Sequence, residues 1–419
     1  MPRFAFSPSA FIKAIDRSPE ETFDEASVRA LLKHAAATAA TAADDSADEE
    51  WAAARDAAIT AFVRPGFTAT SPSSTHLTKQ QLQMALCSCP EEVFDGRSGS
   101  RAEAQAVNAA EEAAGTPHIY ALDVAATRAY LCARYVHSPK RRDMRVGGGD
   151  NLTLRFAVWT PSPEKWSAGP RGLYLLFHGG GWMYGDGAGQ NDERLEAMCD
   201  ELGLVVMAPD YRKAPEHPFP AALEDCEAAA AWVEANAVAE FGTNTLIMGG
   251  ESAGGNLCAA VLLRRRDAHA AACTTAAAAG FPWRLVNFVY GVFDLQGTPS
   301  VAAFGNETAR DFHYFCDSYC SDVRLRLTPD ASPIRGDLAG LPPAVFTVGT
   351  EDSLIDDTLL MYAAWRAANN QAWLDVWPDG PHGVGHSYGA HADTTLGAAC
   401  RARVHRRIDR FLHHLAPDI

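Results

Sequence analysis

The chain has 419 residues, of which 47% are hydrophobic and 21% charged, and these values are ordinary for a globular protein. Its formal net charge of −16 repels nucleic acid and anionic membrane surfaces, so neither is an expected partner. We expect a cytoplasmic protein with free thiols, no membrane span and no metal, because the sequence lacks a secretory apolar core, a window of about 18 apolar residues and any CxxC or Cys/His metal spacing.

Residues 1–140 are rich in alanine and carry helical patterns that clusters of Ser, Pro and Gly separate, such as TATSPSS and DGRSGS. Alanine favours the helical conformation, but it buries little apolar area per residue. We therefore expect several helices here that pack against a larger domain.

Residues 141–419 alternate between apolar strands and helical patterns. Strands are expected at 151–159, 172–178, 204–210, 245–250, 285–294, 343–350 and 372–378. Helices are expected at 191–202, 222–241, 254–268, 358–369 and 396–415. This alternation predicts an α/β fold with a mostly parallel central sheet that is covered on both faces. Functional side chains in such sheets lie at the carboxyl ends of the strands.

The segment TLIMGGESAGGN places the pattern G-x-S-x-G, at 250–254, between an expected strand and an expected helix. This is the context that a nucleophile elbow requires, with Ser252 as the nucleophile. Glycine is needed on both sides because side chains at Gly250 and Gly254 would collide with the neighbouring strand and helix. The alternative is a plain Gly-Ser turn before an ordinary helix, so further residues must decide.

A serine hydroxyl becomes a nucleophile only with a base beside it, and the base needs a group that orients it. In the fold that carries the elbow, the acid and the histidine follow the serine in that order. Suitable residues follow two later strands, and they are Glu351, Asp352, Asp356 and Asp357 after 343–350, and His382 and His386 after 372–378. This ordered set predicts a triad of serine, aspartate and histidine.

From about residue 143 to its end, the chain resembles the hormone-sensitive-lipase-type family of α/β-hydrolases, a group of carboxylesterases. Four motifs carry the resemblance, and they are HGGGW (178–182), PDYRKAPEHPFPAALED (209–225), GESAGGN (250–256) and SPIRGDLAGLPPAVFTVGTEDSLIDD (332–357). The resemblance implies an α/β-hydrolase fold with a mostly parallel central sheet and a helical N-terminal cap.

The resemblance also assigns the site residues. It implies Ser252 as nucleophile, His382 as general base and Asp352 as the group that orients the base. It further implies an oxyanion hole made by the backbone N–H groups of three residues, Gly179, Gly180 and Ala253. His386, four residues beyond His382, is the alternative base.

Several other motif residues receive weaker assignments. Trp182 and Glu251 are candidates for substrate contact, although a structural role is favoured for Glu251. His178 is interpreted as a residue that braces its loop, and Arg212 and Glu216 as residues that brace a turn. The chain departs from the family pattern at Lys213, Val384 and Ser353, and the last two departures concern the shape of the pocket and not the triad.

In the resembled family, N-terminal helices form part of a cap over the active site. We therefore interpret residues 1–140 as an enlarged helical cap and residues 141–419 as the catalytic domain. A segment at about 295–331, between two expected strands, is interpreted as an insertion that joins the cap. The N-terminal helices hold too few bulky apolar residues for an independent core.

The leading hypothesis is a serine carboxylesterase that acts on small to medium acyl esters without a cofactor. One alternative is an amidase or deacetylase similar to arylformamidase, which would use the same triad. A second is a non-catalytic small-molecule receptor on the same fold, which the retained His382 disfavours. The oligomeric state stays open, with a homodimer suggested because esterases of this type are often dimers.

Overall fold

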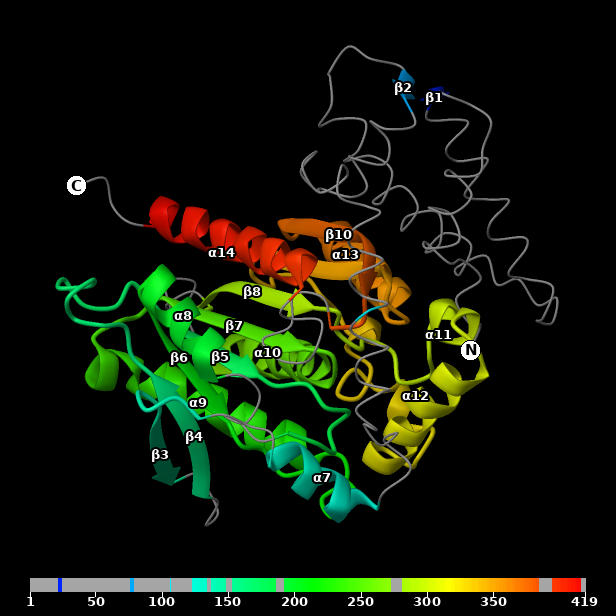
Figure 1. The fold of residues 1–419 in the computed structure, drawn as a ribbon, viewed down its shortest axis with the longest axis horizontal. Helices are drawn as coiled ribbons and strands as arrows, with labels where there is room; N and C mark the ends of the chain where they lie inside the picture. The colour runs from blue at the N-terminus through cyan, green and yellow to red at the C-terminus, as the bar shows by residue number, and fades with distance from the viewer. Residues whose placement is uncertain are drawn as a thin grey trace.

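An eight-stranded sheet with the strand order β10-β9-β8-β7-β5-β6-β4-β3 organises the protein in the computed structural model (Figure 1). The structure describes residues 22–24, 76–78, 106, 123–133, 137–147, 153–185, 192–272, 281–383 and 394–415. The strands of this sheet are β3 (Arg142–Gly147), β4 (Thr153–Trp159), β5 (Gly172–Phe177), β6 (Leu204–Pro209), β7 (Leu246–Glu251), β8 (Trp283–Val289), β9 (Ala344–Glu351) and β10 (Ala372–Pro381). β5 to β10 run parallel, whereas β4 is antiparallel to both β3 and β6. The mostly parallel sheet predicted from the sequence is confirmed.

The helices described after residue 150 are α8 (Asp192–Leu202), α9 (Ala221–Phe241), α10 (Ala253–Ala272), α11 (Pro299–Ala303), α12 (Asn306–Tyr319), α13 (Ile355–Ala367) and α14 (Thr395–Leu415). Two short 3-10 turns, η2 (Leu325–Leu327) and η3 (Pro333–Arg335), precede β9. In the described part of the chain, no helix combines the length and the hydropathy needed to cross a bilayer.

Helices cover both faces of the sheet. α9, α10 and α13 share the larger hydrophobic core with one face, and α8 and α14 share a second core with the other (Figure 1). On α14, Val404, Ile408 and Leu412 recur every fourth residue and pack in the second core. All six residues of β5 and all six of β6 are buried, so these strands appear in the sequence as continuous apolar runs.

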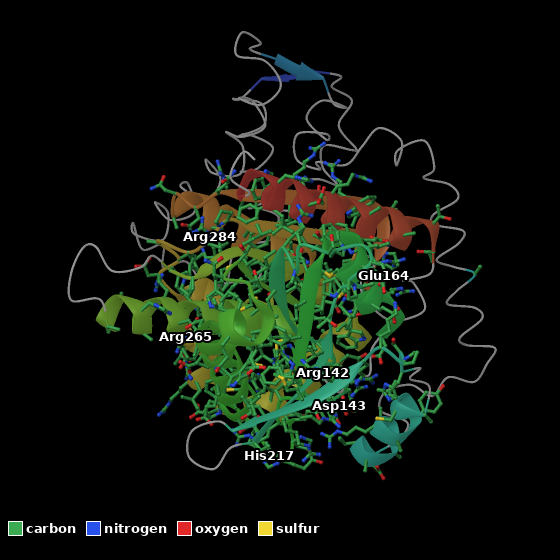
Figure 2. All side chains as sticks on the ribbon, turned by 90° about the vertical axis from the view of Figure 1, so that its left-hand side faces the viewer. Arg142, Asp143, Glu164, His217, Arg265 and Arg284 are labelled. Atoms are coloured by element: carbon green, nitrogen blue, oxygen red, sulfur yellow. The ribbon has the colours of Figure 1, made fainter. Side chains whose placement is uncertain are left out.

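The structure departs from the predicted strands in two places. β3 was not expected, because its sequence RDMRVG is mostly charged and its residues are exposed or half-buried. Figure 2 shows Arg142 and Asp143 on this outer strand, where charges discourage pairing with another sheet edge. The strand expected at 285–294 is observed as β8 and ends at Val289, because Tyr290 turns the chain with a φ of 35°.

Only short parts of residues 1–140 are described. β1 (Thr22–Asp24) pairs antiparallel with β2 (His76–Thr78). α7 (Val124–Cys132) begins at Asp123, whose carboxylate accepts a hydrogen bond from the backbone N–H of Ala126 at 2.7 Å. The other helices expected before residue 120 lie outside the described residues, so the cap boundaries stay a prediction.

Candidate active site

Ser252 lies in the tight turn between β7 and α10. Its φ of 52° is in the left-handed region, which a residue with a side chain rarely occupies. Its N–H donates to the carbonyl of Val289 at 3.1 Å, and its own carbonyl accepts from the N–H of Val292 at 3.1 Å. The end of β8 and the segment after it therefore fix the strained backbone. This strand–turn–helix geometry is that of a nucleophile elbow.

The flanking glycines are required by close backbone contacts. A Cβ at Gly250 would lie 2.1 Å from the carbonyl oxygen of Gly254 in α10. A Cβ at Gly254 would lie 2.0 Å from the carbonyl oxygen of Phe177 in β5. Both obstacles are backbone atoms, so no side-chain rotation relieves them. The collisions with a neighbouring helix and strand that the sequence predicted are confirmed.

Asp352 and His382 meet at the ends of β9 and β10. The Nδ1 atom of His382 lies 3.0 Å from each carboxylate oxygen of Asp352. Asp352 is fully buried, and its Oδ1 also accepts from the N–H of Leu354 at 2.9 Å. A proton on Nδ1 can be donated to this carboxylate, which leaves Nε2 as the basic nitrogen. His386, the alternative base, and Val384 lie outside the described residues.

The carboxylate controls the protonation of the histidine. The burial of part of the His382 side chain, which is 51% exposed, lowers its pKa, but the charge of Asp352 and the hydrogen bond to it outweigh this effect and raise the pKa above the ordinary value of 6.5. The imidazolium form is thus favoured by its partner. A base that receives a proton during reaction benefits from that arrangement.

Tyr290 is a contact that the sequence did not reveal. Its ring centroid lies 4.8 Å from that of His382, and its backbone N–H donates to the carbonyl of Thr347 in β9 at 2.7 Å. Two residues later, Val292 contacts Ser252, as described above. One short segment after β8 therefore touches both the elbow and the histidine. No spacing rule marks it, because it appears only as the end of an apolar run.

The three glycines after β5 form a second tight turn. Gly180 and Gly181 have φ values of 111° and 59°, and the carbonyl of Gly180 accepts from the N–H groups of Met183 and Tyr184 at 3.1 and 2.9 Å. A Cβ at Gly180 would lie 2.5 Å from the carbonyl oxygen of Tyr184. Within the described part of the chain, the N–H groups of Gly179 and Gly180 donate to no protein acceptor. The turn thus holds two backbone donors beside the end of β5.

His178, at the start of this turn, is a buried residue that contacts Tyr211. The two rings stack with centroids 4.3 Å apart, and the Tyr211 hydroxyl donates to the His178 carbonyl at 2.9 Å. The Nδ1 atom of His178 lies 2.7 Å from the carbonyl oxygen of Gly179. These contacts agree with the loop-bracing role that we assigned from the sequence.

The two candidates for substrate contact are enclosed by protein. Trp182 is 2% exposed and stacks on Tyr319 of α12, with centroids 4.5 Å apart. Glu251 is 5% exposed and lines a cavity of about 50 Å³ with Tyr174 and Asn287, on the face that α8 and α14 cover. Both side chains are buried in protein contacts, and their assignment as substrate contacts stays a prediction.

The departures from the family pattern have local partners. The Lys213 ammonium donates to Asp210 at 2.6 Å and to the carbonyl of Tyr211 at 3.0 Å. The carbonyl of Ser353 accepts from the hydroxyl of Ser300 at 2.6 Å. The two departures that the structure describes thus take part in polar contacts of the surrounding loops. Among the described residues, no group of three or more His, Cys, Asp or Glu side chains is arranged to hold a metal ion.

Comparison with known proteins agrees with this architecture. The sequence profile of the alpha/beta hydrolase fold family matches residues 174–386. The carboxylic ester hydrolase LipN of Mycobacterium tuberculosis is 34% identical over 220 residues, a match that covers 50% of this chain and 56% of LipN. The chain thus spans little more than half the length of LipN. The carboxylesterase NlhH of Mycobacterium tuberculosis is 31% identical over 246 residues, which cover 58% of this chain and 75% of NlhH.

Solved structures show the same fold. A hyperthermophilic esterase from the archaeon Pyrobaculum calidifontis superposes with a TM-score of 0.59 and 25% identity, covering 69% of this chain and 94% of that one. A thermostable esterase from Pseudomonas putida superposes with a TM-score of 0.64 and 23% identity, covering 75% of this chain and 98% of that one. The chain therefore belongs to the α/β-hydrolase fold family, in its hormone-sensitive-lipase-type branch.

Proposed function

We propose that the protein is a serine carboxylesterase that hydrolyses small to medium acyl esters. The observation that carries this proposal is the hydrogen-bonded pair of Asp352 and His382, with Nδ1 at 3.0 Å from both oxygens, in a chain that also holds the strained elbow at Ser252. The relatives named above are esterases, which supports the same reaction class.

In the first step, Nε2 of His382 accepts the proton of the Ser252 hydroxyl while Oγ attacks the ester carbonyl carbon. The carbonyl π electrons move to oxygen, and a tetrahedral oxyanion forms. Asp352 accepts the Nδ1–H bond throughout, so it keeps the ring in the reactive tautomer and stabilises the imidazolium. The raised pKa of His382 is consistent with this stabilisation.

The oxyanion accepts hydrogen bonds from the backbone N–H groups of Gly179, Gly180 and Ala253. The first two have no acceptor within the described protein, and the third lies at the first residue of α10, where the helix dipole favours negative charge. Loss of one such donor typically costs about 3–4 kcal/mol of transition-state stabilisation.

The intermediate then collapses. The bond to the alcohol oxygen breaks, His382 gives its proton to that oxygen, and an acyl group remains on Ser252. A water molecule gives a proton to Nε2 of His382 while its oxygen attacks the acyl carbon, which forms a second tetrahedral intermediate. When this intermediate collapses, the bond between the acyl carbon and Oγ of Ser252 breaks, His382 returns its proton to Oγ, and the carboxylic acid leaves. The chemistry needs no cofactor. The insertion at 295–331 and residues 1–140 would cover this site as a cap.

A panel of nitrophenyl esters of increasing chain length, with the matching nitroanilides, tests the proposal on the wild type and on Ser252→Ala. We expect turnover of the shorter esters by the wild type, much slower cleavage of the anilides, and a loss of activity in Ser252→Ala of at least about 10⁴-fold. A wild type without any esterase activity would contradict the function. Activity retained in the variant would contradict the mechanism.

A further inference from the structure

One arginine fastens α7, from the N-terminal region, to the catalytic domain. Nε of Arg128 donates to the carbonyl of Met183 at 2.8 Å, and Nη2 donates to the carbonyl of Ala214 at 2.7 Å. Nη1 and Nη2 also bind the two carboxylate oxygens of Glu216, each at 2.8 Å. The Arg128 side chain is 26% exposed, so most of this contact is enclosed.

These acceptors belong to two loops that contact each other. The Met183 carbonyl lies in the glycine turn, where the N–H of Met183 itself donates to the carbonyl of Gly180 at 3.1 Å. Ala214 lies in the segment after β6, and its N–H donates to the carbonyl of Trp182 at 3.0 Å. Arg128 therefore closes a ring of hydrogen bonds in which each loop binds the other and both bind the guanidinium.

The backbone acceptors distinguish this contact from an ordinary surface ion pair. An ion pair needs only Glu216, which is 52% exposed, and it would leave the loops free to shift. The planar guanidinium instead directs its N–H bonds along fixed directions to two carbonyl groups at once. A lysine at this position could neutralise Glu216 but could not reproduce that geometry.

A second contact with the same turn comes from α12. The ring of Phe315, in α12, occupies the space where a Cβ at Gly181 would lie, 2.1 Å from its Cδ1 atom. Phe315 also packs edge-on against Tyr184, with ring centroids 6.0 Å apart. The turn is thus fixed by α7 through polar contacts and by α12 through aromatic ones.

We propose that Arg128 is a positioning residue for the reaction: it couples α7 to the glycine turn and so sets the direction of the N–H groups of Gly179 and Gly180. The N-terminal region then contributes to stabilisation of the oxyanion and does not merely cover the substrate. This inference rests on the proposed esterase function. It predicts that loss of the guanidinium lowers kcat and leaves KM nearly unchanged, because the oxyanion contact forms in the transition state.

The test compares three variants of the full chain with nitrophenyl butyrate as substrate. Arg128→Met removes all donors and keeps an apolar stem, Arg128→Lys keeps the charge, and Glu216→Gln keeps both carbonyl contacts. Arg142→Met, at an exposed arginine of β3, is the matched control. We expect kcat to fall about tenfold in both Arg128 variants, since small misplacements of a reacting group are costly. KM should change by less than twofold, and Glu216→Gln should lose less than threefold in kcat.

Two further readouts separate positioning from a loss of folding. Affinity for a trifluoromethyl ketone, which forms an oxyanion adduct with a catalytic serine, should fall in Arg128→Met by the same factor as kcat/KM. Methylguanidinium added to Arg128→Ala should restore kcat several-fold and should not affect Arg142→Ala. Wild-type kcat and ketone affinity in Arg128→Met and Arg128→Lys would overturn the inference. A fall explained by KM alone or by unfolding in a thermal melt, without rescue, would also overturn it.

The ester turnover of the wild type distinguishes a failure of the proposed esterase function from a failure of the proposed role of Arg128. If the wild type cleaves the ester and Ser252→Ala does not, the proposed function holds, and the Arg128 variants alone decide the inference. If the wild type cleaves no ester and forms no adduct with the ketone, the function and the inference that rests on it both fail.

Discussion

The nucleophile elbow and the glycine turn follow neighbouring parallel strands, β7 and β5, but different contacts hold them. Ser252 is fixed almost entirely by the backbone, through hydrogen bonds with Val289 and Val292 and through the close approach of Gly254 to Phe177. These contacts leave little space for adjustment. The residues that make them lie at the ends of β5 and β8 and at the start of α10, so formation of the sheet brings them together.

The glycine turn is held mainly by side chains from distant segments. Arg128 lies 55 residues before Met183 in the chain, Tyr211 lies 33 residues after His178, and Phe315 comes from the insertion between β8 and β9. The difference indicates that contacts within the sheet and the adjoining helix α10 suffice to hold the elbow. The glycine turn, in contrast, depends on contacts with α7 and α12, so we expect substitutions in those two helices to lower kcat without abolishing activity.

The largest effect on activity should come from removing the negative charge of Asp352. The elbow and the glycine turn cannot support the reaction without the base His382, which Asp352 orients. Asp352→Asn keeps the shape of the buried group, but the neutral amide neither holds the neutral ring in the tautomer with its proton on Nδ1 nor stabilises the imidazolium by charge. We therefore expect kcat to fall by about 10⁴-fold. Steady-state kinetics and a thermal melt measure the change. A loss of less than about tenfold would show that another group orients His382.

Two alanine substitutions test the comparison directly. In Gly254→Ala the new Cβ meets the Phe177 carbonyl at 2.0 Å, so we expect a loss of about 3–5 kcal/mol in the free energy of unfolding. In Gly181→Ala the new Cβ meets the Phe315 ring, which can move, and the strained φ of 59° should cost about 1–3 kcal/mol.

Chemical denaturation gives both values, with Gly147→Ala as the control, since nothing lies within 4 Å of its added Cβ. A larger loss of stability in Gly181→Ala than in Gly254→Ala would reverse our account of which turn is the rigid one.

The pH dependence of activity reports the interaction between Asp352 and His382. His382 must be neutral to accept a proton, so kcat/KM should fall as the pH decreases through its pKa. Because Asp352 raises that pKa, the midpoint should lie above 6.5, and Asp352→Asn should move it to lower pH. A pH–rate profile of both proteins with a short ester tests this sign. A midpoint that does not move would place the observed titration on another group.

The smallest effect is expected for Tyr211→Phe. This change removes the hydroxyl that donates to the His178 carbonyl at 2.9 Å and keeps the stacked rings 4.3 Å apart. We expect a loss of about 1 kcal/mol in stability and a decrease in kcat of a few-fold, since the hydroxyl contacts with the carbonyl and Nδ1 of His178 are lost. A decrease as large as that of Arg128→Met would mean that the stacking pair, and not the arginine, sets the position of the turn.

Features with a local physical cause could be predicted from the sequence. The buried parallel strands appear as apolar runs, and the elbow appears as glycines around a serine between a strand and a helix. Asp352 and His382 could be placed because they follow strands whose carboxyl ends meet at one edge of the sheet. β3 escaped prediction because an exposed edge strand needs no apolar pattern.

Contacts between distant segments could not be predicted. Arg128 carries no signal of its role, because its acceptors lie 55 to 88 residues away and two of them are backbone carbonyls. The stacking of Trp182 on Tyr319 of α12 is another such contact, because the two residues lie far apart in the chain. Tyr290 contacts His382 because the chain turns sharply after β8, and a strand pattern does not indicate where the strand ends.

The central claim is that Ser252 carries the acyl group, and the most direct measurement is the mass of the labelled protein. The wild type would be labelled with a fluorophosphonate, or mixed rapidly with a nitrophenyl ester and quenched with acid to trap the acyl-enzyme. The labelled protein would then be digested and analysed by mass spectrometry. We predict one adduct per chain, on the peptide that contains Ser252, and none in Ser252→Ala. Stoichiometric labelling of a different residue, or equal labelling of the variant, would contradict the account.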